Sequence, residues 1–218
     1  MHQCAQYGQN PKLSHEKAVK RIIRYLRRTR DKGLILIVNE DLGLECYMDA
    51  NFAGTFDKNK PDNPRDCLSR TGYIIKYAGC PIIWASKMQT TIAMSTTEAE
   101  YMALSTAMRE VIYCIHLLDE LTKKGIRLSR STPVVKCSVF EDNVGAIELA
   151  KMPKWRPRTK HIAIQYHHFR EWTVAKPDGT PPWVTVQHIS TIFQEADIMT
   201  KPLPKAQFEA LCKALCGW

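Results

Sequence analysis

Apolar residues near the start of the chain recur at the spacing of one helix face. They are Val19, Ile22, Ile23 and Leu26. Ser14 is placed to cap this helix and Gly33 to end it. Eight Lys or Arg residues lie between Lys17 and Lys32. We interpret this basic helix as a solvated face, as a contact with a phosphate backbone, or as a packing arm of a neighbouring domain.

The pattern then changes to the alternation typical of β-strands. The run LILIV, residues 34–38, predicts a lead-in strand. Three further runs, LECYMDANF, TGYIIKYAG and CPIIWASK, predict antiparallel strands that open the main sheet. Between the first two of these lies Asp57 to Asp66, whose Lys, Asp, Pro and Asn residues predict an exposed loop.

A long helix is expected from about Ser95 to Lys124, because this stretch has no Gly or Pro, keeps an apolar stripe and is followed by Gly125. Downstream, VVKCSVFE and WVTVQHIS predict strands. DNVGAIELAK and EADIMTK predict short helices, TKHIAIQYHHFREWTVA predicts a longer helix, and KAQFEALCKAL predicts a last amphipathic helix. Without the lead-in strand the order is β-β-β-α-β-α-α-β-α, which describes a mixed α/β sheet with helices on its faces.

Composition narrows the class of protein. The 218 residues are 44% hydrophobic, enough for a packed core, and the formal charge of +9 favours a polyanionic partner such as nucleic acid. The eight cysteines show neither a CxxC pair nor zinc spacing, which indicates reduced, mostly buried thiols. No apolar run is long enough to span a bilayer, and the polar N-terminus is not a signal peptide. We therefore expect a soluble, intracellular protein.

Two acids stand out on the predicted strand and helix. Asp49 shares a strand face with Glu45 and Tyr47, and taken alone it is equally an acid on an edge strand. Ser95 and Glu98 match a capping box, which gives Glu98 a structural role. Glu100 lies about 200° around the helix from Glu98, on the inner side, where an unpaired carboxylate suggests a ligand.

Two further acids lie at junctions of strand and helix. Asp142 follows a predicted strand, where open α/β sheets place their sites, although an ordinary N-cap explains it equally well. Its neighbour Glu141 is expected to be exposed to solvent. Asp197 lies in the first turn of a short helix, where the helix dipole alone favours an acid.

If these four carboxylates converge, they repel one another and need cations. A pair about 4 Å apart costs roughly 4 kcal/mol at an effective dielectric near 20. Ligand sets made only of oxygen suit Mg²⁺ or Mn²⁺, and two such ions suit phosphodiester hydrolysis without a protein nucleophile.

The sequence resembles the ribonuclease H domain at the C-terminal end of copia-type LTR retrotransposon polyproteins. The matching stretches are CYMDANFAG, SRTGYIIKYAGCPIIWASKMQ, MSTTEAEYMALSTAMREVIY, EDNVGAIELAK, RPRTKHIAIQYHHFRE and EADIMTKPLPKAQFEAL. The resemblance implies a ribonuclease H-like fold, a mixed five-stranded sheet flanked by helices, with an extra N-terminal basic helix and a C-terminal helix. It divides the chain into a connection segment from the reverse transcriptase side (1–33), a ribonuclease H domain (34–202) and an amphipathic helix (203–218).

The resemblance also implies an activity: hydrolysis of the RNA strand of RNA–DNA hybrids during reverse transcription. The implied metal ligands and catalytic residues are Asp49, Glu100, Asp142 and Asp197, holding two Mg²⁺, with Mn²⁺ as an alternative. The implied nucleic-acid contacts are Gly54, Lys87, Gln89, Ser95, Thr96, Asn143, Arg158, Lys160 and His161. The implied partner is the reverse transcriptase domain of the same polyprotein, in the cytoplasm and within virus-like particles, with no membrane involved.

Departures from the family pattern and rival functions remain. Asn51 replaces an acid common in the strand motif, and His188 lies in a predicted strand rather than in the mobile loop where related enzymes carry a His that assists product departure. A decayed domain that binds nucleic acid without cutting is the main alternative. An integrase or transposase is disfavoured, because such enzymes carry their Glu late, on a helix after the second Asp.

Overall fold

The computed structural model describes residues 4–5, 7–56, 58, 64–126, 128, 136–152, 162 and 164–217. The chain divides into two compact units, Met1–Ile35 with Trp218 and Leu36–Gly217. Each unit is described by itself.

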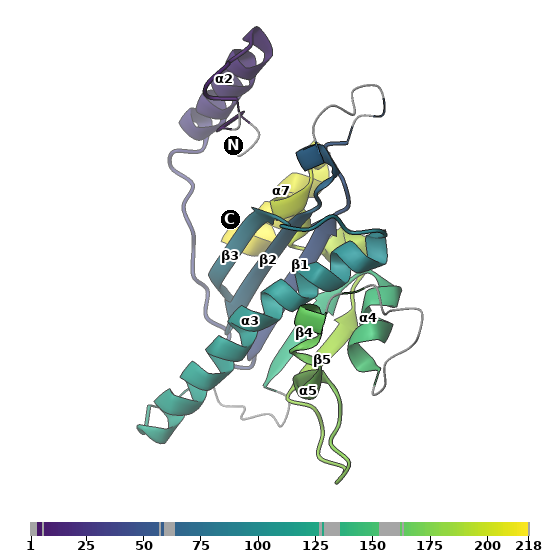
Figure 1. Ribbon diagram of the computed structural model, residues 1–218. Helices are drawn as coiled ribbons and strands as arrows, with labels where there is room; N and C mark the ends of the chain where they lie inside the picture. The colour runs from purple at the N-terminus through teal and green to yellow at the C-terminus, as the bar shows by residue number, and fades with distance from the viewer. Residues whose placement is uncertain are drawn as a thin grey trace. The chain divides into compact units, whose positions relative to one another are not determined.

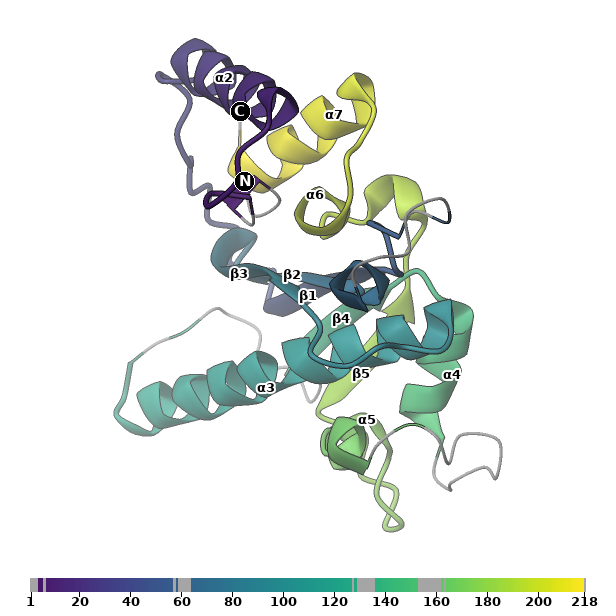
Figure 2. The same ribbon diagram turned by 45° about the horizontal axis from the view of Figure 1, so that its top comes forward.

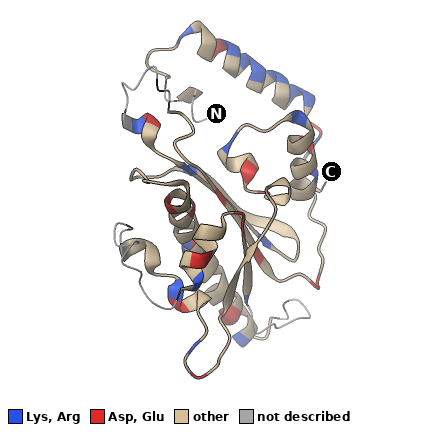
Figure 3. Ribbon diagram, turned by 90° about the vertical axis from the view of Figure 1, so that its right-hand side faces the viewer, with Lys and Arg blue, Asp and Glu red and all other residues tan. Residues whose placement is uncertain are grey.

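The first unit contains the basic helix α2, Leu13–Arg28. The helix begins after Lys12 rather than at a Ser14 cap, because the His15 ring nitrogen accepts the Lys12 backbone N–H at 3.0 Å. It ends at Arg28, before the predicted stop at Gly33. None of its residues is buried within the unit. Blue basic positions recur along this helix, at the top of Figure 3.

The predicted lead-in strand is wrong. Leu34–Val38 forms no strand, and Leu36, Ile37 and Val38 are 57%, 67% and 65% exposed. A strand needs a neighbouring backbone to pair with. In the part of the chain that is described, the next backbone hydrogen bond comes only at Asn39, whose N–H donates to Ala78 O at 2.9 Å. The run therefore has the residue types of a β-strand but forms no β-sheet hydrogen bonds with a neighbouring strand.

The second unit is built on the predicted five-stranded mixed sheet, in the order β3-β2-β1-β4-β5 (Figure 1). The strands are β1 (Leu44–Asn51), β2 (Arg70–Tyr77), β3 (Cys80–Met88), β4 (Cys137–Glu141) and β5 (Val184–His188). The first three are antiparallel, whereas β4 runs parallel to both β1 and β5. Ala78 and Gly79 join β2 to β3 with φ angles of 52° and 78°, the two positive values that a tight hairpin turn needs.

Helices cover both faces of this sheet (Figure 2). On one face lie α3 (Thr96–Lys123), α4 (Val144–Lys151) and α5 (Arg170–Thr173), and on the other lie α6 (Asp197–Thr200) and α7 (Lys205–Cys216). The core between α3 and the sheet consists of buried apolar side chains. It includes Cys46, Met48, Ile75, Tyr101, Leu104, Met108, Val111 and Val139.

The long helix predicted over TKHIAIQYHHFREWTVA is wrong for the described residues. They form a 3₁₀ turn, Ile164–His167, and the short α5. Phe169, which lies between the two, is fully buried in the core, and Thr173 Oγ1 donates to Ala150 O at 2.8 Å. The chain turns here so that Phe169 and Thr173 reach the core and α4.

A buried ion pair ties β2 to the turn before α6. Lys76 Nζ lies 3.0 Å from Glu195 Oε1, and both side chains are less than 10% exposed, at 9% and 8%. The ammonium also lies 5.6 Å from the centre of the Tyr47 ring. Breaking a buried pair leaves one charge uncompensated, whereas replacing both partners by apolar groups does not.

We expect Lys76→Met to lower the free energy of unfolding by about 3 to 5 kcal/mol, because Glu195 would remain buried without its partner. The double variant Lys76→Met/Glu195→Leu should recover most of that loss. Urea denaturation measures both. The matched control is Lys123→Met, which breaks an exposed pair with Glu120 and should leave stability nearly unchanged. Equal losses in Lys76→Met and Lys123→Met would contradict this account.

Candidate metal centre

The site lies where two parallel strands separate. β1 and β4 are paired from Leu44 and Cys137 up to Tyr47 and Phe140, and no further. Asp49, on β1, and Asp142, directly after the end of β4, each lie two residues beyond the last pair. Because both strands end on the same edge of the sheet, their carboxylates come side by side.

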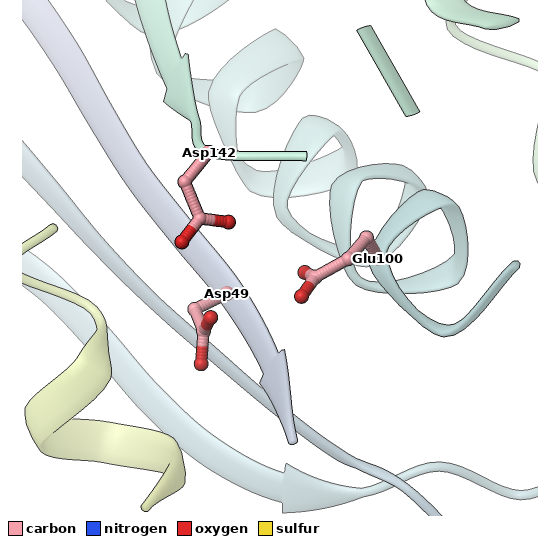
Figure 4. Close-up of side chains that lie close together, drawn as sticks. All are labelled: Asp49, Glu100 and Asp142. Carbon is pink, nitrogen blue, oxygen red and sulfur yellow. The ribbon is translucent and has the colours of Figure 1, made fainter. Parts of the chain in front are cut away.

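Three carboxylates converge at this point. Asp49, Glu100 and Asp142 offer oxygens that all lie within 4.8 Å of one another. Figure 4 shows Glu100 pointing from α3 toward the two aspartates. Asp49 is 1% exposed and Glu100 7% exposed, so two of the three are withdrawn from water.

Glu98 has the structural role that the capping box predicts. Ser95 Oγ accepts the Glu98 backbone N–H at 3.1 Å, and the Glu98 carboxylate accepts the N–H of Met94 at 2.7 Å. In a standard capping box the carboxylate accepts the N–H of the N-cap residue, here Ser95, whereas Glu98 accepts the N–H of the preceding residue. Glu100 is left free to face the two aspartates.

Asp142 is not the N-cap of α4. That role belongs to Asn143, whose side chain accepts the Ala146 N–H at 3.0 Å. Asp142 instead accepts a hydrogen bond from Thr191 Oγ1 at 2.9 Å. The helix cap and the carboxylate of the cluster are therefore adjacent but separate residues.

The expectation that Glu141 is exposed was wrong, since its exposed fraction is 0%. Oε1 accepts the Asn143 N–H at 2.8 Å, and within the described chain Oε2 accepts no hydrogen bond. The strand pattern contained the signal, because Glu141 continues the buried alternation of Cys137 and Val139. Sequence reasoning thus missed a further buried acid beside the cluster.

Asp197 begins α6, is fully buried, and does not belong to the group of three. Lys201, which the sequence analysis did not single out, lies between it and β1. The Lys201 ammonium lies 2.9 Å from Asp197 Oδ1 and 3.4 Å from Asp49 Oδ1. Asp49 also accepts a hydrogen bond from the Thr200 hydroxyl. An internal cation therefore stands between the first and the fourth predicted ligand.

Burial and mutual repulsion disfavour the charged forms of these acids. Burial, followed by the charges of Glu141, Asp49 and Asp142, raises the pKa of Glu100 far above its usual range. Burial also raises the pKa of Glu141. Burial and the two neighbouring aspartates raise the pKa of Asp197 to about 6, although Lys201 opposes the shift. Without added cations the cluster is reluctant to ionise completely.

The donor set fits hard divalent cations. All its ligand atoms are carboxylate oxygens, the type that Mg²⁺, Mn²⁺ and Ca²⁺ prefer. Among the described residues, Glu100 Oε2 and Asp197 Oδ2 are buried yet accept no hydrogen bond, whereas Asp197 Oδ1 is paired with the Lys201 ammonium. Buried polar oxygens without partners are unfavourable unless something binds them. A bound cation would satisfy them.

Comparison with known proteins places the chain in a family. No family model matches it. The retrovirus-related Pol polyprotein from transposon RE1 of Arabidopsis thaliana is 38% identical over 209 residues, which cover 96% of this chain and 13% of that protein. The retrovirus-related Pol polyprotein from transposon TNT 1-94 of Nicotiana tabacum is 37% identical and covers 98% of this chain and 14% of that protein. The chain belongs to the copia-type retrovirus-related Pol polyproteins. This Pol segment spans only 13% to 14% of the length of these relatives.

One solved structure is similar at lower identity. It is the N-terminal RNase H domain of Rv2228c from Mycobacterium tuberculosis, solved as a fusion with maltose-binding protein. It is 10% identical to the Pol segment, covers 79% of this chain and 98% of that chain, and has a TM-score of 0.42.

Within the described residues, none of the helices has the length and apolar character needed to cross a membrane.

The described residues among the expected nucleic-acid contacts come from several elements of the second unit. Ser95 and Thr96 lie at the start of α3, Asn143 at the start of α4, and Gly54 in the turn after β1. Lys87 is exposed near the end of β3, whereas Gln89 is buried and its amide donates to Thr71 Oγ1 and Ala99 O at 3.1 and 2.9 Å. Gln89 therefore has a structural role. Arg158, Lys160 and His161 lie outside the described residues.

Raised carboxyl pKa values predict how the stability of the metal-free Pol segment depends on pH. A carboxyl whose folded-state pKa lies above its unfolded value stabilises fully below the unfolded pKa, and this contribution is lost as pH rises through the folded pKa. The contribution of Asp197 to folding stability is therefore lost between about pH 4 and pH 6, and the contribution of Glu100 is lost as the pH rises further.

We expect Glu100→Gln to raise the metal-free melting temperature at about pH 8 by a few degrees, since about 1 kcal/mol corresponds to roughly 2 to 4 °C at this chain length. At about pH 4, where Glu100 is protonated in both states, the difference should vanish. Thermal melts in a chelator measure it. The control Glu148→Gln, on the exposed side of α4, should change neither value. A melting temperature for Glu100→Gln at or below wild type at about pH 8 would count against the site.

Proposed function

We propose that this Pol segment is a ribonuclease H, which hydrolyses the RNA strand of RNA–DNA hybrids with two divalent metal ions during retrotransposon reverse transcription. The observation that carries the proposal is the convergence of Asp49, Glu100 and Asp142 at the end of two parallel strands. The Pol membership of the chain supplies the context in which such hybrids occur.

The chain's own residues divide the work. Asp49, Glu100 and Asp142 would hold one ion, and Asp49 with Asp197 would hold the second, so that Asp49 serves both. Bound there, the ions would supply the charge that favours attack of water on the phosphodiester and departure of the 3′-oxygen. The carboxylates would hold the ions in their deprotonated form, which is the form that binds metal. In this scheme no side chain forms a covalent intermediate.

Recognition of the hybrid would rest on shape. The width of the minor groove and the 2′-hydroxyls of one strand distinguish a hybrid from duplex DNA and duplex RNA, without reading of bases. Backbone N–H groups and hydroxyls at the start of α3 and α4, near Ser95, Thr96 and Asn143, lie beside the cluster and would contact phosphates. The partner is the reverse transcriptase domain of the same polyprotein, in cytoplasmic virus-like particles.

The test is cleavage of a labelled RNA–DNA hybrid with Mg²⁺ or Mn²⁺, alongside duplex DNA and duplex RNA. We expect cutting of the hybrid's RNA strand only, abolished by chelation. Asp49→Asn and Asp142→Asn should each lower the rate by more than about 100-fold, because each removes a ligand itself rather than a group supporting one. Hybrid binding should survive in both variants.

Glu148→Gln is the matched control, since it removes one exposed acid from α4 and should retain full activity. Hybrid binding by the wild-type chain without any cutting would favour the decayed domain over the enzyme. Near-normal cleavage by Asp49→Asn would remove Asp49 from the site.

A further inference from the structure

The separation of β1 from β4 leaves backbone groups that need partners. Beyond Tyr47 and Phe140 the two strands no longer pair, although β1 stays paired with β2 up to Asn51 and β4 with β5 up to Glu141. The carbonyls at the point of separation, those of Met48 and Phe140, thus face a gap inside the core. A buried carbonyl without a donor is destabilising.

The side chain of Gln194 fills this gap. Gln194 is fully buried, and its amide nitrogen donates to Met48 O at 2.9 Å and to Phe140 O at 3.3 Å. An amide NH₂ has two protons, so both are used, one for each strand. Its carbonyl oxygen accepts the N–H of Ala196 at 3.4 Å, and its backbone carbonyl accepts the N–H of Asp197 at 3.2 Å.

One residue therefore joins three chain segments that each carry a predicted ligand. Met48 precedes Asp49, Phe140 lies two residues before Asp142, and Gln194 itself begins the turn that ends in Asp197. We infer that Gln194 is a positioning residue, which sets the separation of Asp49, Asp142 and Asp197 and so tunes the site for the small, geometrically demanding Mg²⁺ ion. This inference rests on the proposed function, because it assumes that the cluster binds divalent ions.

The turn that Gln194 begins is fixed at other points as well. Glu195 pairs with Lys76 of β2, Ser86 Oγ of β3 donates to Met199 O at 2.6 Å, and Asn51 Nδ2 of β1 donates to Thr200 O at 3.4 Å. These contacts hold the turn against the antiparallel half of the sheet. Gln194 reaches the backbone of β4 at Phe140, and Thr191, three residues before it, donates to the Asp142 carboxylate at 2.9 Å.

Few side chains can replace Gln194. Glutamate has the same length but, when ionised, has no proton to donate to either carbonyl. Asparagine keeps the amide but is one methylene shorter. Methionine keeps the length and the apolar volume but provides no donor. The three substitutions separate donor capacity from reach.

The same observations allow a purely structural role, in which the bonds only stabilise the fold. The two roles predict different effects of a Gln194 substitution on the affinities for Mg²⁺ and Ca²⁺. Mg²⁺ requires near-ideal octahedral geometry, whereas Ca²⁺ accepts flexible arrangements of more ligands. Misplacement of the carboxylates would therefore weaken Mg²⁺ more than Ca²⁺, but a loss of stability alone would not change the ratio of the two affinities.

We would measure Mg²⁺ and Ca²⁺ affinities of the full chain by titration calorimetry, after confirming folding by circular dichroism. We expect Gln194→Met to weaken Mg²⁺ binding about 10- to 100-fold, as loss of groups that support metal ligands typically does, and Ca²⁺ binding by less than about 3-fold. Gln194→Asn should fall between wild type and Gln194→Met. If Gln194→Met does not fold, the Gln194→Asn ratio decides.

The control is Thr173→Val, which removes the hydrogen bonds of the buried Thr173 hydroxyl to Ala150 O and Arg170 O, away from the carboxylates. It should lower the melting temperature and leave both affinities unchanged. A folded Gln194 variant with a wild-type ratio of Mg²⁺ to Ca²⁺ affinity would overturn the inference and leave the proposed function standing. A wild-type chain that binds no divalent ion would overturn the proposed function, and the inference with it, before any variant is examined.

Discussion

Repulsion between buried carboxylates is the constraint around which the second unit is organised. Asp49, Glu100 and Asp142 lie within 4.8 Å of one another, and Glu141 and Asp197 are fully buried beside them. In a medium of low dielectric such a group opposes folding. The rest of the fold must hold it together with stronger interactions.

Four such interactions are present in the second unit. The apolar core under α3 fixes the helix that carries Glu100, and the sheet fixes the strands that carry Asp49 and Asp142. The ion pair of Lys76 with Glu195 attaches the Asp197 turn to β2. Lys201 provides a positive charge between Asp49 and Asp197. Within the described part of the chain, Lys201 is the cation that pairs with this group of acids, and one positive charge does not balance them, which is the physical reason to expect divalent ions.

The sequence predicts the regular elements and most of the acidic residues of the site. Alternation and helical spacing located the five strands and α3, since these are patterns of local sequence. The capping box separated Glu98 from Glu100 for the same reason. The failures depend on tertiary context. Leu34–Val38 has the composition of a strand but has no neighbouring strand to pair with. The helix predicted around Phe169 is interrupted where the Phe169 side chain is buried in the core.

The sequence analysis missed Gln194 and Lys201 for the same reason, namely that their contacts depend on tertiary structure. Gln194 and Lys201 are ordinary polar residues in the sequence, and their roles follow from carbonyls and carboxylates that lie many residues away. The burial of Glu141, by contrast, could have been predicted from the sequence, because Glu141 continues the alternation of buried positions along β4.

The most direct test of the central claim, that these carboxylates form a cation site, is anomalous X-ray scattering from crystals of the chain soaked in Mn²⁺. We expect a peak enclosed by Asp49, Glu100 and Asp142. We also expect a second peak between Asp49 and Asp197, with the Lys201 ammonium displaced. A saturating soak that leaves the three carboxylates without a peak would contradict the account.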